Sequence, residues 1–403
     1  MSDFGVDDFT ASMVLSSATG VILLVGPVAS VVIERLGCRW SVVIGSIISV
    51  AGFVAARFAV SILQLGAALV MAGAGSGIVN LAGVVIIPKY FDAQLALAQG
   101  IGSAGCGFGG FIMAKVERYL LDELSWRGAM LVMGGISANL CICGVLFVEP
   151  LKLGIFLQQG LKKKPDHDVS YSSGDSSTIS RDSSRAPLKT PDSEISESEK
   201  MSFAENMRLY GSLWCDWRFL LLVLSDFLSW LVQLTPYHHL PTMASQLDFA
   251  DGQGANLVSS LGLFAAAGKI FFGMIVTRTK LSSTNVFIIA QILFGVSILL
   301  APFCATYGSL ILFAISFGFL SGCYALMMVI TQDALGEEKF HAAYGMLLFI
   351  EAVGVIAGSP LAGKANDAFG SYNLAFYLSG AVLVLSALLL LPIMRAQRRS
   401  LDL

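Results

Sequence analysis

Three ionisable side chains stand inside long apolar runs of this chain, where charge is rare. Lys269 lies in GLFAAAGKIFFGMI (262–275), Asp226 in LLVLSDFLSWLVQL (221–234) and Glu351 in LLFIEAVGVIAGSP (347–360). An ammonium group can bind an anionic ligand, and a carboxyl group can pair with that ammonium or take up a proton. These residues are therefore the first candidates for binding a ligand or an ion.

Lys269 is the most costly of the three to place. A charge at the centre of a membrane helix costs about 2.5–3.5 kcal/mol on insertion scales, so it must face protein or water. Gly262, Gly268 and Gly273 flank it and allow other helices to approach closely. Snorkelling to an interface is the alternative, but Lys269 lies about two turns from either end of its apolar run. We expect it to bind a carboxylate in a cavity.

The composition indicates the elements that must hold these residues. Of the 403 residues, 55% are hydrophobic and 13% charged, with a mean hydropathy of +0.75. Soluble domains carry about 25% charged residues, so the chain is predicted to be an all-α polytopic membrane protein. No nucleophile–base or metal-ligand pattern appears, and the seven cysteines are expected to pack as small hydrophobes. An enzyme, a cofactor, a metal and a nucleic-acid partner are therefore not expected.

The apolar runs define about eleven spans. Five lie in an N-terminal bundle (1–149), six in a C-terminal bundle (216–394), and 395–403 forms a tail. Between the bundles, 150–215 is basic at first and then rich in Ser, Asp and Glu, which predicts a disordered linker. The predicted spans are 11–33, 40–60, 63–87, 95–116, 127–148, 217–238, 255–277, 284–304, 308–331, 343–365 and 372–393.

Lys and Arg residues are distributed unequally between the two sets of loops. The set holding Arg35, Lys89, Arg278 and Arg395 is the more basic, which by the positive-inside rule makes it cytoplasmic. The N-terminus is then outside, and the linker and the C-terminus are cytoplasmic.

The first predicted loop reads GPVASVVIERLGCR (26–39). It resembles the loop between the second and third helices of major facilitator transporters, in which an acidic–basic pair is followed by Gly and a further basic residue. A tight turn at Gly37 would present Glu34, Arg35 and Arg39 beside a neighbouring helix end. Pairing that breaks when two bundles rock would make these residues a gate; a plain positive-inside anchor is the alternative.

Several further stretches together resemble the monocarboxylate transporter family, across essentially the whole chain. They imply the major facilitator fold of two helical bundles. The stretches are PKYFDAQLALAQGIGSAG (88–105), SWRGAMLVMGGISANLCICGVLF (125–147), TPYHHLPTMA (235–244) and AGSPLAGKANDAFGSYNLAFYLSG (357–380).

The chain departs from the family pattern in two places. The family has twelve helices and this chain about eleven, so the first helix, with a lysine that handles substrate, is expected to be missing. Family members carry Asp-x-x-x-Arg on the eighth helix, where this chain has Ala265 and Lys269. Lysine supplies a point charge in place of a bidentate fork, so selectivity should differ.

The resemblance implies a plasma-membrane solute carrier that moves monocarboxylates or related small organic acids by alternating access, as a proton symport. Lys269, Asp226 and Glu351 would form its substrate site. A single-span accessory glycoprotein and membrane lipid would be its partners. One alternative is a proton-independent facilitator of a zwitterionic or aromatic compound, such as an aromatic amino acid, a thyroid-hormone-like compound or creatine. Another is a truncated, non-transporting isoform that acts as a membrane partner.

Overall fold

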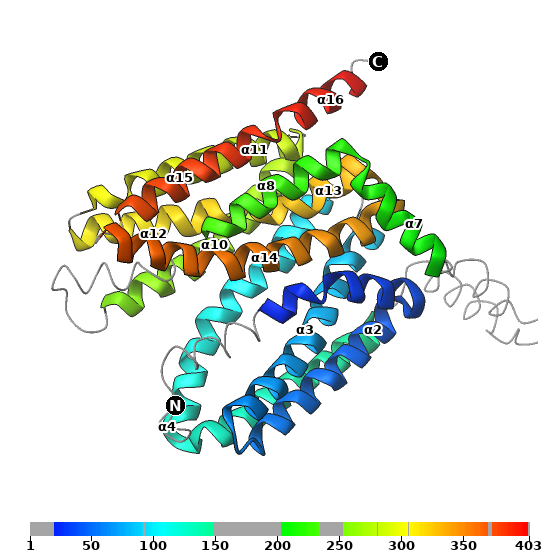
Figure 1. The fold of residues 1–403 in the computed structure, drawn as a ribbon, viewed down its shortest axis with the longest axis vertical. Helices are drawn as coiled ribbons and strands as arrows, with labels where there is room; N and C mark the ends of the chain where they lie inside the picture. The colour runs from blue at the N-terminus through cyan, green and yellow to red at the C-terminus, as the bar shows by residue number, and fades with distance from the viewer. Residues whose placement is uncertain are drawn as a thin grey trace, which may run out of the picture.

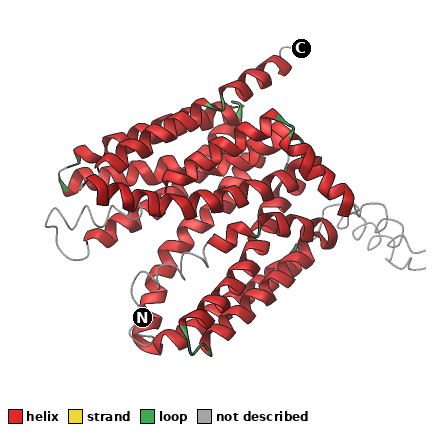
Figure 2. Cartoon of the chain, in the orientation of Figure 1, coloured by secondary structure: helices red, strands yellow, loops and turns green. Residues whose placement is uncertain are grey.

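The structure is a computed structural model that describes residues 20–91, 94–147, 203–233, 253–279, 281–304, 306–369 and 373–401. Its regular elements within these ranges are all helices (Figure 2). They are α2 (Gly26–Arg57), α3 (Ile62–Tyr90), α4 (Leu95–Leu146), α7 (Phe203–Trp214), α8 (Trp217–Gln233), α10 (Gln253–Thr279), α11 (Ser283–Leu300), η2 (Ala301–Phe303), α12 (Tyr307–Ser321), η3 (Gly322–Leu326), α13 (Met327–Leu335), α14 (Glu337–Phe369), α15 (Asn373–Leu388) and α16 (Leu391–Leu401).

The helices form two groups, as the expected major facilitator fold requires (Figure 1). In the N-terminal group, α2 packs on both α3 and α4. In the C-terminal group, α10 packs on α12, α11 on α15, and α8 on α14. The groups meet where α4 lies against α10 and α2 against α14. These two contacts are the seams between the bundles, and they bound any cavity that lies between them.

Two long helices are each interrupted by a turn that reverses the chain. Gly37 in α2 has φ 77° and ψ 162°, a conformation that glycine adopts without strain. The tight glycine turn expected at this loop is therefore confirmed. Ser125 in α4 has φ 59° and ψ 167°, between the fourth and fifth predicted spans.

The helices match the predicted spans. Nine helices among the described residues are long and apolar enough to cross a membrane. One of them, Gly26–Arg57, contains the Gly37 turn and so covers parts of the first two predicted spans. The 17-residue α8 corresponds to the sixth predicted span. Residues 11–19 of the first predicted span lie outside the described residues.

Burial follows the logic of a protein in lipid. Large aliphatic side chains such as Ile47, Ile289 and Leu312 are 58%, 62% and 64% exposed. Between helices, by contrast, lie small and polar residues, including Ser46 and Ser386 at 0% exposed. In lipid, helix association rests on close packing and interhelical hydrogen bonds, so small residues belong inside and aliphatic ones face the hydrocarbon. The chain is a multi-pass membrane protein.

The last part of the predicted disordered linker is helical, which corrects that prediction. Residues 203–214 form α7, whose Leu209, Tyr210 and Leu213 pack with Phe219 and the small residues of α14. Apolar residues recur here at helical spacing, so this end of the linker packs as an amphipathic helix despite its polar composition. Residues 150–202 lie outside the described residues.

Candidate functional site

A cavity of about 650 Å³ lies between the two groups of helices. The N-terminal group contributes residues from α3 and α4, and the C-terminal group from α8, α10, α12, η3, α13 and α14. Its described lining includes Asn80, Gln99, Ser103, Cys106, Trp230, Gln233, Ala265, Lys269, Ser321, Tyr324, Tyr344 and Glu351. This is a volume suited to a small molecule, with polar groups set in an apolar surface.

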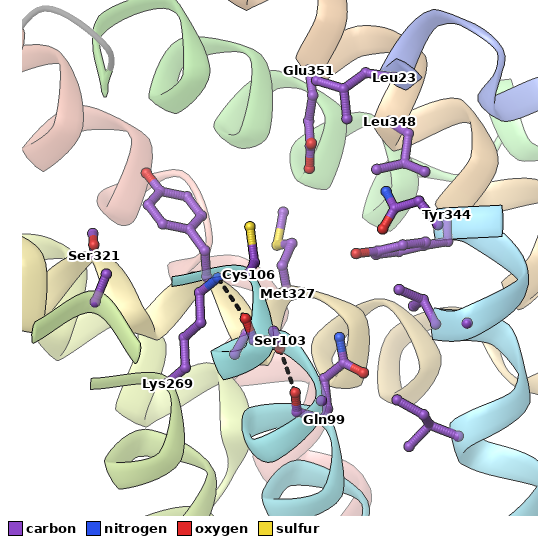
Figure 3. Close-up of a pocket in the computed structure, with 18 of the residues that line it drawn as sticks. Leu23, Gln99, Ser103, Cys106, Lys269, Ser321, Met327, Tyr344, Leu348 and Glu351 are labelled. Atoms are coloured by element: carbon purple, nitrogen blue, oxygen red, sulfur yellow. Dashed lines mark hydrogen bonds between the residues drawn. The ribbon is translucent and has the colours of Figure 1, made fainter. Parts of the chain in front are cut away.

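Lys269 lies in this cavity, among side chains from both groups of helices (Figure 3). Its Nζ donates a hydrogen bond to the carbonyl oxygen of Ser103 on α4, at 3.1 Å. Among the described lining residues it is the only lysine or arginine. Ala265, one turn earlier on α10, lines the same cavity. The end of the Lys269 side chain therefore lies in a cavity, and its carboxylate-binding role stays a prediction.

The flanking glycines position Lys269 as expected. A Cβ at Gly268 would collide with the backbone of Phe319 on α12, and one at Gly273 with the backbone of Ala96 on α4. A Cβ at Gly107 on α4 would lie 2.7 Å from the carbonyl oxygen of Gly262. Close approach on both sides of α10 fixes the helix that carries the lysine.

Glu351 shares the cavity with Lys269, whereas Asp226 is placed behind the described cavity lining. Glu351 is 7% exposed and lines the cavity, and Asp226 is 1% exposed. The two carboxyl groups are close enough to interact electrostatically. Neither oxygen of Asp226 has a hydrogen-bond partner among the described residues. A buried, unpaired carboxylate is costly, so the two carboxyl groups together are a candidate proton-binding site.

Trp230 and Tyr324 connect the carboxyl pair to the cavity. The Trp230 indole lies beside both carboxyl groups, without its N–H reaching hydrogen-bond geometry with either. Its ring is 5.7 Å from that of Tyr324, centroid to centroid. Both aromatic side chains line the cavity, so a ligand bound there would lie close to the carboxyl pair.

A buried polar cluster supports Tyr324 from within the C-terminal bundle. The side-chain amide of Gln291 donates to the hydroxyls of Ser229 at 2.8 Å, Ser386 at 3.1 Å and Tyr324 at 3.1 Å. Ser225 in turn donates to the carbonyl oxygen of Ser386 at 2.9 Å. These bonds join α8, α11, η3 and α15, and so hold the aromatic wall of the cavity in place.

The candidate gate residues lie at the Gly37 turn, away from the cavity lining. Arg35 and Arg39 are exposed and Glu34 is half-buried. The turn is secured by a hydrogen bond from the Ser41 hydroxyl to the carbonyl oxygen of Gly37, at 2.8 Å. The two arginines thus lie at the turn between two helical segments, a position compatible with both the gate and the anchor interpretations.

Tyr210 of α7 is a residue of this region that the sequence did not indicate. Its hydroxyl donates to the carbonyl oxygen of Pro27 at 3.2 Å and hydrogen-bonds the hydroxyl of Ser30, both on α2. Burial, assisted by the nearby Glu34 carboxylate, raises the pKa of Tyr210 above its usual value. Because the segment before α8 was predicted to be disordered, its only signal was the apolar spacing of Leu209, Tyr210 and Leu213.

A polar stripe on α4 was also missed. Gln99, Ser103 and Cys106 recur at helical spacing and all line the cavity. Cys106 is exposed there, which is contrary to the expected packing role; Cys38 and Cys323 are buried as expected. The signal was available in the sequence as neutral polar residues on one face of an apolar helix.

A family model described as Major Facilitator Superfamily matches residues 1–339 and, overlapping, 240–402. Monocarboxylate transporter 12 of Mus musculus is 30% identical over 400 residues, which cover 96% of this chain and 78% of that protein. Monocarboxylate transporter 14 of Mus musculus is 29% identical over 416 residues, which cover 94% of this chain and 81% of that protein. These relatives carry the names of transporters, not of enzymes.

Solved structures share the fold. The fucose:proton symporter of Escherichia coli matches with a TM-score of 0.68 at 14% sequence identity, covering 95% of this chain and 90% of the symporter. A proton:xylose symporter matches with a TM-score of 0.71 at 13% identity, covering 96% of this chain and 87% of the symporter. The two-bundle arrangement described above is therefore that of major facilitator transporters.

Proposed function

Because the chain belongs to the monocarboxylate transporter family of the major facilitator superfamily, we propose that it moves a small organic carboxylate across the plasma membrane by alternating access. In this mechanism the two bundles rock about a central site that faces one side of the membrane and then the other. The cavity between α4, α10 and α14 is that site.

One observation carries the proposal: an ammonium group lies in a cavity of small-molecule size, and no carboxylate of the described residues is bound to it. Within the described ranges, the hydrogen-bond partner of the Lys269 Nζ is the carbonyl oxygen of Ser103. A neutral carbonyl leaves the positive charge uncompensated, so a substrate carboxylate gains a charge-assisted hydrogen bond on binding. Hydrogen bonds to charged groups contribute about 1.5–3 kcal/mol each.

Proton coupling is assigned to Asp226 and Glu351. Two carboxyl groups that share a buried environment disfavour double ionisation, so the pair takes up one proton readily. Among the described residues, Tyr324 and Tyr344 are further titratable groups that interact with it. Protonation would remove a negative charge from the cavity that holds the substrate anion, which links proton uptake to carboxylate binding.

The Gly37 turn supports a proposal for the gate and for the orientation of the chain. By the positive-inside rule its arginines favour a cytoplasmic location for this side, with the C-terminus on the same side. Glu34, Arg35 and Arg39 would pair with neighbouring helix ends when this side is closed.

A second candidate function is facilitated transport of a zwitterion. It is favoured by the presence of Glu351 in the same cavity as Lys269, together with the rings of Trp230, Tyr324 and Tyr344. A carboxylate could bind the lysine while a cationic group meets Glu351 and an aromatic face. Under this alternative Glu351 would stay ionised and would not carry protons.

Uptake by proteoliposomes containing the purified chain separates the two. Labelled lactate, pyruvate, an aromatic amino acid and creatine would be offered at acidic and at neutral outside pH. Acid-stimulated uptake of lactate or pyruvate supports the proton-linked carboxylate transporter. Uptake of a zwitterion without pH dependence supports the second candidate. A correctly inserted chain that moves none of these compounds contradicts both and favours a role as a membrane partner.

Lys269→Gln tests the anchor in the same assay. We expect it to lower kcat/KM for the transported carboxylate about ten- to a hundredfold, as the loss of one charge-assisted hydrogen bond predicts. Lys339→Gln, which removes a lysine from the first turn of α14 and not from the cavity lining, is the matched control. An equal effect of both substitutions would show that Lys269 acts only through overall charge.

A further inference from the structure

The stripe on α4 places a thiol beside the candidate carboxylate anchor. Cys106 is an exposed free cysteine that lines the central cavity. Its sulfur is close enough to Lys269 for the two groups to interact electrostatically. In Figure 3 the Cys106 side chain and the end of the Lys269 side chain lie side by side in the cavity.

A third group shows that this part of the cavity is built for a ligand. Gln99, two turns before Cys106 on the same face of α4, is 4% exposed and lines the cavity. Its Oε1 has no hydrogen-bond partner among the described residues. Buried amides normally have all their polar atoms paired, so this atom is left for a molecule that enters the cavity.

We propose that Cys106 is a covalent modification site for small carboxylates that carry an electrophilic carbon. Lys269 binds the carboxylate of such a molecule and holds its reactive carbon next to the Cys106 sulfur. With an α-halo acid, the thiolate attacks the carbon that bears the halogen. A carbon–sulfur bond forms, the carbon–halogen bond breaks, halide leaves, and the thiol proton passes to water.

Charge and position both make Cys106 selective for anions. Positioning two reactants in one cavity raises their effective concentration over free encounter in solution. A partly buried ammonium attracts a carboxylate more strongly than bulk water allows, so an anionic reagent is enriched where a neutral one of the same shape is not. Cys215, an exposed cysteine at the end of α7, has Asp216 as its next neighbour and gains no such enrichment.

The experiment compares iodoacetate with iodoacetamide on the purified full-length chain in detergent, at one mildly alkaline pH. Alkylation of each cysteine is followed over time by peptide mass spectrometry. The ratio of iodoacetate to iodoacetamide rates at Cys106 is divided by the same ratio at Cys215, which removes the intrinsic reactivities of the reagents. We expect the normalised ratio to exceed one by about tenfold.

Variants of Lys269 test whether its charge causes the preference of Cys106 for iodoacetate. Lys269→Gln should bring the normalised ratio to about one, and Lys269→Arg, which keeps the charge, should preserve the preference for iodoacetate. Excess lactate or another transported carboxylate should slow alkylation of Cys106 and leave Cys215 unaffected. Size-exclusion chromatography confirms that each variant remains folded.

Three results would overturn the proposal: no alkylation of Cys106 by either reagent, a normalised ratio near one in the unmodified chain, or a preference that survives Lys269→Gln. The proposal deepens the carboxylate site of the proposed function. Because alkylation is measured without flux, a chain that alkylates as expected but transports nothing would refute transport alone.

Discussion

At the scale of individual residues, the carboxyl pair of Asp226 and Glu351 has the clearest functional consequence. Asp226 is enclosed by the C-terminal bundle, and Glu351 meets the cavity. In the proposed mechanism, a proton therefore reaches the pair from the cavity side, with Glu351 as its first acceptor. Protonation of the pair would then depend on the state of the substrate site.

Replacing Glu351 by Gln is expected to abolish the acid stimulation of carboxylate uptake. Wild-type uptake should rise as outside pH falls, because protonation of the pair is then driven from outside; the variant should give similar rates at acidic and neutral pH. Uptake into proteoliposomes at the two pH values measures this ratio. Glu338→Gln, at an exposed position in the first turn of α14, is the control.

The zwitterion alternative gives a different result for the same variant. If Glu351 binds a cationic group of the substrate, Glu351→Gln raises KM while uptake remains independent of pH. An unchanged pH ratio together with an unchanged KM would exclude both roles for Glu351.

The candidate site residues that the sequence predicts are the charged ones. Lys269, Asp226 and Glu351 stand out because an ionisable group in an apolar run has a high cost that must be compensated. Gln99, Gln233 and Cys106 line the same cavity, but neutral polar residues are common in membrane helices as structural hydrogen-bonding groups. Whether these side chains point into the cavity depends on how the helices pack around it, which the sequence does not give.

Among the elements, α7 joins the two bundles on the side of the Gly37 turn. It packs on α14 and α8 of the C-terminal bundle, while its Tyr210 hydroxyl bonds α2 of the N-terminal bundle. If this side opens by separation of the bundles, these hydrogen bonds must break. We therefore expect α7 to stabilise the state in which this side is closed.

Tyr210→Phe tests this role by removing the hydroxyl and retaining the ring. The lost bonds contribute about 0.5–1.5 kcal/mol each, so the closed state should become several-fold less populated. Alkylation of Cys38, which is 1% exposed and follows the Gly37 turn, should then be correspondingly faster. Tyr90→Phe, at a residue that is 44% exposed, should leave the rate unchanged.

The stabilisation of the closed state by the Tyr210 hydroxyl depends on pH with a definite sign. Because burial raises the pKa of Tyr210, the protonated phenol, which donates to the Pro27 carbonyl, is favoured in the closed state. Its stabilisation is fully present below the usual tyrosine pKa of about 10 and is lost as pH rises through the higher value. The difference between wild type and Tyr210→Phe should thus be constant around neutral pH.

The contact of α4 with α10 depends on glycine at particular positions. A Cβ at Gly100 would collide with the carbonyl oxygen of Lys269, whereas one at Gly105, on the same helix, would meet open space. Both are glycines of an apolar helix, and the sequence alone does not distinguish them. The identity of the facing helix distinguishes them, and that is a property of the tertiary fold.

Gly100→Ala is expected to destabilise the structure by about 1–3 kcal/mol, the usual cost of overpacking, while Gly105→Ala should have little effect. Apparent melting temperatures of the two purified variants in the same detergent give the comparison. A similar fall in the melting temperatures of both variants would indicate that the effect comes from helix propensity or lipid contact, and not from the contact between α4 and α10.

At the scale of the whole molecule, hydropathy predicted the membrane-spanning helices, because lipid requires long apolar segments with satisfied backbones. The seams between the bundles carry no such signal. Gly26 of α2 and Gly345 of α14 meet closely, with a Cβ at Gly345 placed 2.9 Å from the carbonyl oxygen of Gly26. Which glycines form such a seam depends on how two separately packed groups of helices meet.

The hydrogen bond from Lys269 to the Ser103 carbonyl spans the two bundles, since α10 belongs to one and α4 to the other. A substrate carboxylate that takes over the ammonium breaks this tie, so the empty carrier is held more firmly than the loaded one. Return of the empty carrier should then limit net flux, and substrate waiting on the far side should relieve that limit. Efflux of labelled carboxylate should accordingly accelerate when unlabelled carboxylate is added outside, and Lys269→Gln should remove the acceleration.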